Sequence, residues 1–112
     1  MSGINYLIEL DKKHLAKHLP NTPQVKRLLS KGLSVHIFKD IETLENVAKL
    51  IIEQGEYIGK VRKYERYGLY FSDVIGYRIS SDGTKLNLYY GEIKINDDNQ
   101  YHVIPRTSPS RD

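Results

Sequence analysis

The spacing of apolar residues changes after Ile41–Gln54, and that change restricts the folds open to this chain. Apolar residues in Ile41–Gln54 recur at helical spacing and form a broad stripe, which predicts an α-helix ended by Gly55. From Tyr57 onward apolar and polar residues alternate, as in antiparallel strands. The order of elements predicts an α+β domain, in which N-terminal helices pack on a twisted antiparallel β-sheet.

Boundary signals divide the helical half. Asp11 is the expected cap of a short helix over Lys12–Leu19, which Pro20 ends. A threonine followed by a proline then predicts the start of a second helix, Pro23–Lys31. Residues 3–10 leave a short strand and a lead-in segment open. Alternation of apolar and polar residues predicts a strand over Leu33–Phe38.

The second half is expected to consist of strands joined by tight turns. A hairpin turn is predicted at Ser81-Asp82-Gly83, and residues 108–112 are expected to fray. The whole chain, 1–112, is expected to be one domain. The predicted strands are Tyr57–Lys63, Gly68–Ser72, Ile75–Ser80, Lys85–Ile95 and Gln100–Pro105.

The pairing of the last two predicted strands can be argued from their residues. The parity of the apolar positions in Lys85–Ile95 changes at Gly91, which predicts a β-bulge. A three-residue loop over Asp97–Asn99 sets Lys94 beside His102 and matches apolar with apolar residues on the opposite face. A four-residue loop shifts this pairing by one residue and is the less favoured alternative.

Composition limits the possible chemistry. The chain has no cysteine, which excludes disulfides, thiolate nucleophiles and cysteine-bound zinc. No apolar run reaches the length of a membrane span, and the N-terminus does not resemble a signal peptide. We therefore expect no membrane partner and a cytoplasmic location, in the producing or a target cell.

The charge distribution favours a polyanionic partner. The net charge is only +3, but residues 12–31 hold six basic residues and no acid, and residues 60–66 hold four basic residues and one acid. Nine tyrosines and no tryptophan are present, several of them between basic residues in Tyr57–Tyr77. These tyrosines suit either packing on a sheet or stacking on unpaired bases.

The first candidate site is a cluster of basic residues near the N-terminus. His14, Lys17 and His18 would share one face of an α-helix. Histidines can act as acid and base on a phosphodiester while lysine stabilises negative charge, although unengaged surface histidines are the alternative. Two histidines four apart can also bind metal. With no obvious third ligand and lysines nearby, we expect no metal and no cofactor.

The second candidate site lies near the C-terminus. His102 falls on the outward face of the last predicted strand, with Arg106 and Thr107 just after its end. An arginine beside a hydroxyl group can clamp a phosphate, although a loose edge arginine is equally open. Glu92 is a further candidate base, to be paired with His102. We interpret His36 as structural, since it lies within a strand.

These segments resemble a known family. Lys17–Pro23 resembles the "KHIPGT" opening of nuclease domains at the C-termini of bacterial polymorphic toxins, with Asn21 where glycine is usual. The relatives are EndoU-like toxins of the barnase–EndoU–colicin–RelE fold group, and the resemblance spans roughly Asp11–Pro109. Similar phrases occur in the same order at Val35–Asp40, Tyr64–Phe71, Ile75–Arg78 and Tyr101–Pro105.

The resemblance implies a metal-independent endoribonuclease that cuts RNA, often tRNA, to a 2′,3′-cyclic phosphate, and an immunity protein that blocks its active site. It implies a catalytic role for His18, more weakly for His14, and polar contributions from His102, Arg106 and Thr107. It also leaves open that the chain is secreted as part of a larger toxin. The competing hypothesis is a non-catalytic RNA- or protein-binding module that uses the basic, tyrosine-rich surface.

Overall fold

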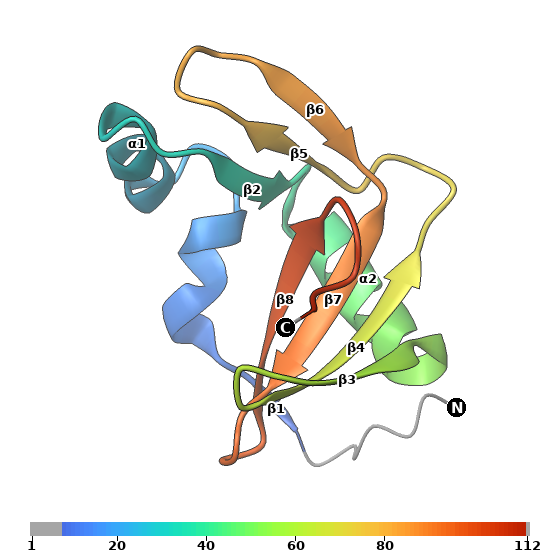
Figure 1. Ribbon diagram of the computed structural model, residues 1–112. Coiled ribbons are helices and arrows are strands. Elements are labelled where there is room, and N and C mark those ends of the chain that lie inside the picture. Colours follow the sequence, from blue (N-terminus) through green and yellow to red (C-terminus); the bar gives the residue numbers. More distant parts are fainter. Residues whose placement is uncertain (1–7, 112) are drawn as a thin grey trace.

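The computed structural model describes residues 8–111 and confirms the α+β class (Figure 1). Within these residues the strands form a five-stranded sheet, in the order β1-β8-β7-β4-β3, and a three-stranded sheet, in the order β2-β5-β6. The elements are β1 Glu9–Leu10, the 3₁₀-helix η1 Lys12–His18, α1 Pro23–Ser30, β2 Val35–Phe38, α2 Ile41–Gln54, β3 Glu56–Val61, β4 Tyr64–Tyr70, β5 Gly76–Ile79, β6 Lys85–Leu88, β7 Tyr90–Ile95 and β8 Gln100–Arg106. No helix among them is long and apolar enough to cross a membrane.

The helices begin where the sequence predicts. Asp11, Thr22 and Asp40 each accept a hydrogen bond from a backbone N–H in the first turn of η1, α1 and α2, at 3.0, 3.2 and 2.7 Å. The bounds of α2 match the prediction. The first helix ends at His18, one residue earlier than predicted, and is a 3₁₀-helix. Residues 3–10 had left a short strand and a lead-in segment open. Residues 3–7 lie outside the described part, and Glu9–Leu10 forms the short strand β1.

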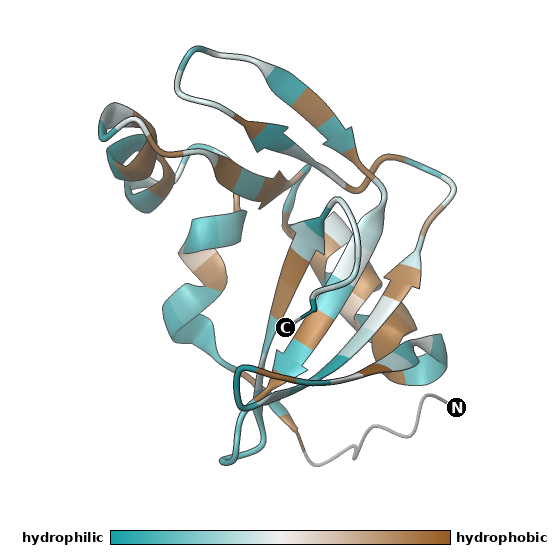
Figure 2. Cartoon of the chain, in the orientation of Figure 1, coloured by the Kyte–Doolittle hydropathy of each residue, from teal (hydrophilic) through white to brown (hydrophobic). Residues whose placement is uncertain are grey.

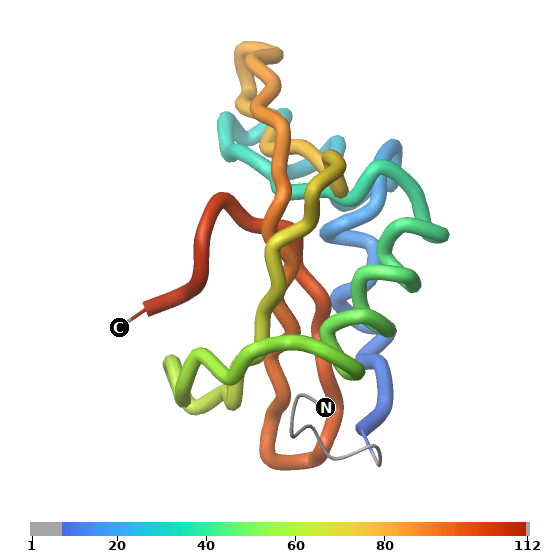
Figure 3. Tube along the Cα trace, turned by 90° about the vertical axis from the view of Figure 1, so that its right-hand side faces the viewer, coloured from blue at the N-terminus to red at the C-terminus, as the bar shows by residue number. Residues whose placement is uncertain are grey.

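The main core lies between α2 and the five-stranded sheet. The apolar stripe of α2 meets odd-numbered residues of the central strands β7 and β8. Figure 3 shows α2 on one side of this sheet, while the C-terminal segment lies on the other. The buried residues of this core include Leu44, Val47, Ala48, Ile51, Ile93, Ile95 and Val103.

The favoured register of the last hairpin is confirmed. Lys94 pairs with His102 across β7 and β8, and Ile95 pairs with Tyr101. The three-residue loop is closed by a hydrogen bond from the Asn96 N–H to the Gln100 carbonyl oxygen, at 3.0 Å. This register places alternate residues of both strands on the face opposite α2.

One predicted strand is wrong: Lys85–Ile95 forms two strands in different sheets. The chain leaves the three-stranded sheet after Leu88 and enters the five-stranded sheet at Tyr90. The change of parity therefore marks a move between sheets rather than a β-bulge at Gly91. A β-carbon at Gly91 would lie 2.6 Å from Val47 Cγ1, so the glycine is needed for close approach of α2.

A second difference concerns the turn between β3 and β4. Arg62 and Lys63 have φ angles of 51° and 72°. They form a two-residue hairpin turn that directly follows the end of β3. Because such turns usually contain asparagine or glycine, the sequence did not reveal this one. The strand predicted at Gly68–Ser72 consequently starts earlier, at Tyr64.

The hairpin of β5 and β6 confirms the turn predicted at Ser81–Gly83. The Gly83 N–H donates to the Ser80 carbonyl oxygen at 2.9 Å, and Gly83 has a φ of 89°. Hydrophilic and hydrophobic residues alternate along β6 (Figure 2), and Leu86 on this strand is 48% exposed. One face of this hairpin is therefore exposed and is not packed on the core.

The end of the chain is the third difference. Residues 108–112 were expected to fray, yet Ser110 is buried against the five-stranded sheet. Its N–H and hydroxyl group both donate to the Glu92 carboxylate, at 2.9 and 2.6 Å. The C-terminal segment thus crosses the sheet face opposite α2 as far as Arg111, and Asp112 lies outside the described residues.

Replacing Gly76 by alanine is expected to destabilise the fold by about 1–3 kcal/mol. Gly76 pairs with Phe38, and a β-carbon there would lie 2.1 Å from the Ile37 carbonyl oxygen, so β2 and β5 would have to separate. Urea denaturation would measure the loss. Ser81→Ala, in the exposed turn of the same hairpin, is the control and should change stability by less than about 0.5 kcal/mol. Equal stability of both variants would contradict the expectation.

Candidate functional site

The candidate site is the face of the five-stranded sheet that α2 does not cover, here called the open face. Odd-numbered residues of β4, β7 and β8 contribute to the main core, so the even-numbered ones point the other way. The open face is therefore rich in charged and titratable side chains close to the centre of the sheet. These residues are Tyr64, Arg66, Glu92, Lys94, His102 and Arg106.

A histidine cluster occupies one end of this face. His102 is only 8% exposed, and its Nε2 lies 3.1 Å from Asp11 Oδ2. The ring of His14 lies against it, with ring centroids 4.2 Å apart. Asp11 is positioned from two sides, because its N–H donates to the Tyr101 carbonyl oxygen and its Oδ1 accepts the Lys13 N–H. Parallel pairing of β1 with β8 thus brings η1 onto the edge of the sheet.

Burial and charge set the protonation states of this cluster. Burial lowers the pKa of His102, and the hydrogen bond with Asp11 only partly offsets the effect. The pKa of Asp11 is also lowered, chiefly by the hydrogen bond from the Lys13 N–H. At neutral pH we therefore expect a neutral His102 beside an ionised carboxylate.

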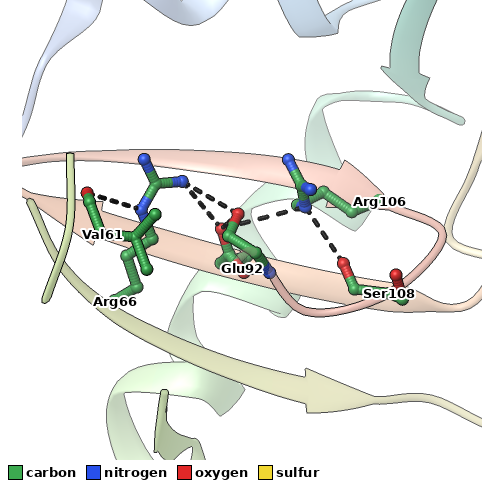
Figure 4. Close-up of polar contacts among 6 residues, drawn as sticks. Val61, Arg66, Glu92, Arg106 and Ser108 are labelled. Carbon is green, nitrogen blue, oxygen red and sulfur yellow. Dashed lines mark hydrogen bonds and ion pairs between the residues drawn. The ribbon is translucent and has the colours of Figure 1, made fainter. Parts of the chain in front are cut away.

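An arginine cluster lies further along the same face (Figure 4). Glu92 is fully buried, and its carboxylate accepts a hydrogen bond from Arg66 Nη1 at 3.0 Å. Arg66 is itself buried and also donates to the Val61 carbonyl oxygen and to Ser110 Oγ. Arg106 approaches from the other side, with its Nε 3.9 Å from Glu92. The carboxylate is thus saturated with partners.

A polar pocket of about 230 Å³ opens beside this cluster. One carboxylate lies beneath its arginines, so the pocket has an excess of positive charge. Its charge suits a phosphate group, and arginine is well suited to bind one. Its lining residues are Val61, Arg62, Arg66, Arg106, Ser110 and Arg111.

Tyr64 and Lys94 join the two clusters. The Lys94 Nζ lies 4.7 Å from the centre of the Tyr64 ring, and the His102 ring lies 6.2 Å from it. Burial lowers the pKa of Lys94, and the nearby charges of Arg66 and Lys17 lower it further. The charge of Lys17 therefore reaches Lys94 on the open face, and the phosphate-binding role of Lys17 stays a prediction.

Residues 6–110 match a family whose description is a domain of unknown function, DUF6972. The chain belongs to this family. No curated protein and no solved structure matches this chain. The name of the DUF6972 family implies no activity, and the resemblance to EndoU-like toxins stays a prediction.

The DUF6972 domain brings together only part of the predicted site. His14 and His102 meet, but His18 reaches β2, where its Nδ1 donates to the His36 carbonyl oxygen at 2.7 Å. The expectation that His18 shares a face with His14 is wrong because η1 is a 3₁₀-helix. With three residues per turn, Lys17 lies above His14 and His18 turns away.

The predicted phosphate clamp is also only partly assembled. Arg106 does line the polar pocket, and its Nε donates to the Ser108 carbonyl oxygen at 3.1 Å. Thr107 is exposed after the end of β8. Glu92, considered as a partner base for His102, has both carboxylate oxygens engaged by other groups. It serves as the buried counter-charge of the arginines.

Other residues of the site were not predicted from the sequence. Asp11 was identified only as a helix cap, and Arg66 carried no local signal for burial. The one usable signal was the strand register, which correctly sets Lys94 beside His102 on the outward face. The sequence suggested a metal site only at His14 and His18, whereas the structure groups Asp11 with His14 and His102.

Proposed function

We propose that this domain is a metal-independent endoribonuclease that binds RNA on the open face and cleaves it to a 2′,3′-cyclic phosphate. The observation that carries the proposal is the contact of His14 with His102, at 4.2 Å between ring centroids, on a face that also presents lysines and arginines. Cleavage of this kind needs a base, an acid and cations around the phosphorane. With tRNA as the expected substrate, each group can be assigned a role.

His102 is the proposed base. The ionised Asp11 carboxylate can only accept a hydrogen bond, so the Nε2 of His102 donates and its Nδ1 carries the lone pair. The lowered pKa of His102 keeps this ring neutral at pH 7, ready to take the 2′-hydroxyl proton. Asp11 then stabilises the imidazolium that forms, as carboxylates do beside catalytic histidines.

His14 is the proposed acid. Two imidazolium rings in contact would repel each other, so His14 can act as the acid only beside a neutral His102. In that arrangement the pair contains one base and one acid at the same time. His14 is only partly buried, and it can deliver the proton to the 5′-oxygen that leaves.

The remaining groups bind the substrate. Lys94 and Lys17 lie near the histidines and can stabilise the charge that develops on the phosphorane. The arginine-lined pocket can hold a neighbouring phosphate, with Arg106 in the role predicted for it. A groove of about 400 Å³ with the exposed Tyr57 and Tyr70 among its lining residues offers rings for base stacking.

A metal-free cleavage assay tests the proposal. Purified protein would be incubated with a total tRNA pool in EDTA, as wild type and as the variants His14→Gln and His102→Gln. We expect discrete fragments from the wild type and at least about 100-fold slower cleavage by either variant. The new 3′ ends should resist alkaline phosphatase until acid opens the cyclic phosphate.

His36→Gln is the matched control, because His36 lies on β2, away from the His14–His102 contact, and should leave cleavage unchanged. Circular dichroism would confirm that every variant is folded. Intact RNA with the folded wild type would reject the nuclease. If such RNA were bound in a salt-dependent manner, the non-catalytic binding module would take its place. An immunity protein that covers the open face remains a prediction from the resemblance.

A further inference from the structure

We propose that Asp11, His14 and His102 form a binding site for a divalent transition metal, for which Zn²⁺ is the best match. One ligand atom from each residue lies within 4.8 Å of the other two. Asp11 and His14 lie three residues apart, and the pairing of β1 with β8 brings the distant His102 to them. This site is separate from the arginine-lined pocket.

The geometry is close to that of a bound ion. Asp11 Oδ2 and His102 Nε2 are 3.1 Å apart, and two ligands on tetrahedral zinc are separated by roughly 3.3 Å. A small cavity of about 10 Å³ is lined by all three residues, and its other walls are apolar. Because the three ligand atoms are separated by up to 4.8 Å, the His14 ring has to move toward the other two ligands to enclose an ion.

The chemistry of the donors selects the class of metal. Two imidazoles and one carboxylate are typical ligands of Zn²⁺ and Co²⁺, whereas Mg²⁺ and Ca²⁺ favour sites built of oxygen atoms. Three protein ligands leave one position of a tetrahedral ion for water. The second oxygen of Asp11 accepts the Lys13 N–H at 3.0 Å, which orients the carboxylate in the way outer-shell contacts orient metal ligands.

The local charge is mixed. Asp11 supplies a negative charge at the site, whereas the charge of Lys94 reaches His102 and opposes a cation. The Lys94 ammonium group lies over the Tyr64 ring, where it is attracted to the ring face. When the metal takes Nε2 of His102, the proton on that nitrogen leaves and another is taken up at Nδ1. The ring stays neutral, and no net proton is released from it.

Cobalt titration tests the site in the absence of RNA. Co²⁺ would be added to the tag-free full chain and followed by visible absorption, and Zn²⁺ would then be added to displace it. We expect one Co²⁺ per chain, a spectrum typical of tetrahedral coordination, and loss of that spectrum with one equivalent of Zn²⁺. Zn²⁺ should also raise the melting temperature.

Three variants identify the ligands. His14→Gln and His102→Gln should each weaken Co²⁺ binding at least about tenfold, since each removes one of three ligands. Asp11→Asn keeps a helix-capping oxygen but loses the charge, so it tests the carboxylate without disrupting η1. His36→Gln is the control and should bind as the wild type does.

The outcomes are distinct. Absence of a cobalt spectrum at millimolar Co²⁺, or binding that persists in both ligand histidine variants, would overturn the metal site. Because binding is measured without RNA, it can succeed or fail independently of the proposed nuclease. If both proposals hold, Zn²⁺ should inhibit cleavage, because the ion would occupy the nitrogen atoms that the reaction uses.

Discussion

Glu92→Gln is expected to lower the free energy of unfolding by about 3–5 kcal/mol, although the side chain keeps nearly the same shape. Glu92 is fully buried and neutralises Arg66, which is 6% exposed. The amide cannot balance the guanidinium charge, and it cannot accept all the hydrogen bonds that Arg66 and Ser110 now donate. The loss is large because a buried charge is left without a counter-charge.

Urea denaturation of the wild type and three variants would measure this effect. Glu65→Gln is the matched control, because Glu65 lies on the neighbouring strand β4 in an exposed hydrogen bond with Tyr57. Its loss should stay below about 1 kcal/mol. The double variant Glu92→Leu with Arg66→Met should recover much of the stability, since replacing both members of a buried pair leaves no orphaned charge.

A small loss in Glu92→Gln, below about 1 kcal/mol, would contradict this view of the arginine cluster. It would mean that water in the adjacent pocket solvates Arg66 well enough to replace the carboxylate. The pocket would then be wetter, and a weaker anion site, than the proposed function requires.

Lowering the pH is expected to destabilise the wild type more than it destabilises the variant His18→Asn. Burial lowers the pKa of His18 from 6.5 to about 4, and the charges of His36, Lys17 and His102 act in the same direction. Between these two pH values the unfolded chain binds a proton that the folded chain excludes. The free energy of unfolding therefore falls as the pH drops from 6.5 to 4, by up to about 3 kcal/mol from this residue.

The variant isolates that contribution. The amide of asparagine can replace Nδ1 of His18 as donor to the His36 carbonyl oxygen, but it does not titrate. Unfolding free energies would be compared at pH 7.5, 6.0, 5.0 and 4.5. The profile of His18→Asn should be flatter, with a residual slope from His36 and His102, whose pKa values are also lowered by burial. Parallel profiles would show that the folded chain binds a proton at His18 as readily as the unfolded chain does.

Much of the local structure follows from neighbouring residues in the chain. The caps at Asp11, Thr22 and Asp40 and the helix Ile41–Gln54 are set by side chains within one turn. The last hairpin is similar, because its loop and its apolar pattern together leave one favourable pairing. For the same reason the open face and the position of His102 on it could be derived from the sequence.

Features that depend on contacts between distant segments could not be derived. The apolar positions change from even to odd numbers near Gly91, and this change fits either a β-bulge or a move to another sheet. Only the packing of α2 on β7 decides between the two. Likewise, nothing local predicts that Ser110 returns to cover Glu92. The frayed end was a reasonable expectation for a polar tail that lacks apolar residues.

The candidate site shows the same division. Its histidines, lysines and Arg106 were recognised as residue types suited to phosphate chemistry, but their partners were not. His102 is 91 residues from Asp11, and the two meet because a two-residue strand pairs with β8. Most of the elements, and the side chains available for chemistry, thus follow from local sequence. Which of these side chains meet follows only from the folded chain, because that depends on long-range pairing and packing and not on neighbours along the chain.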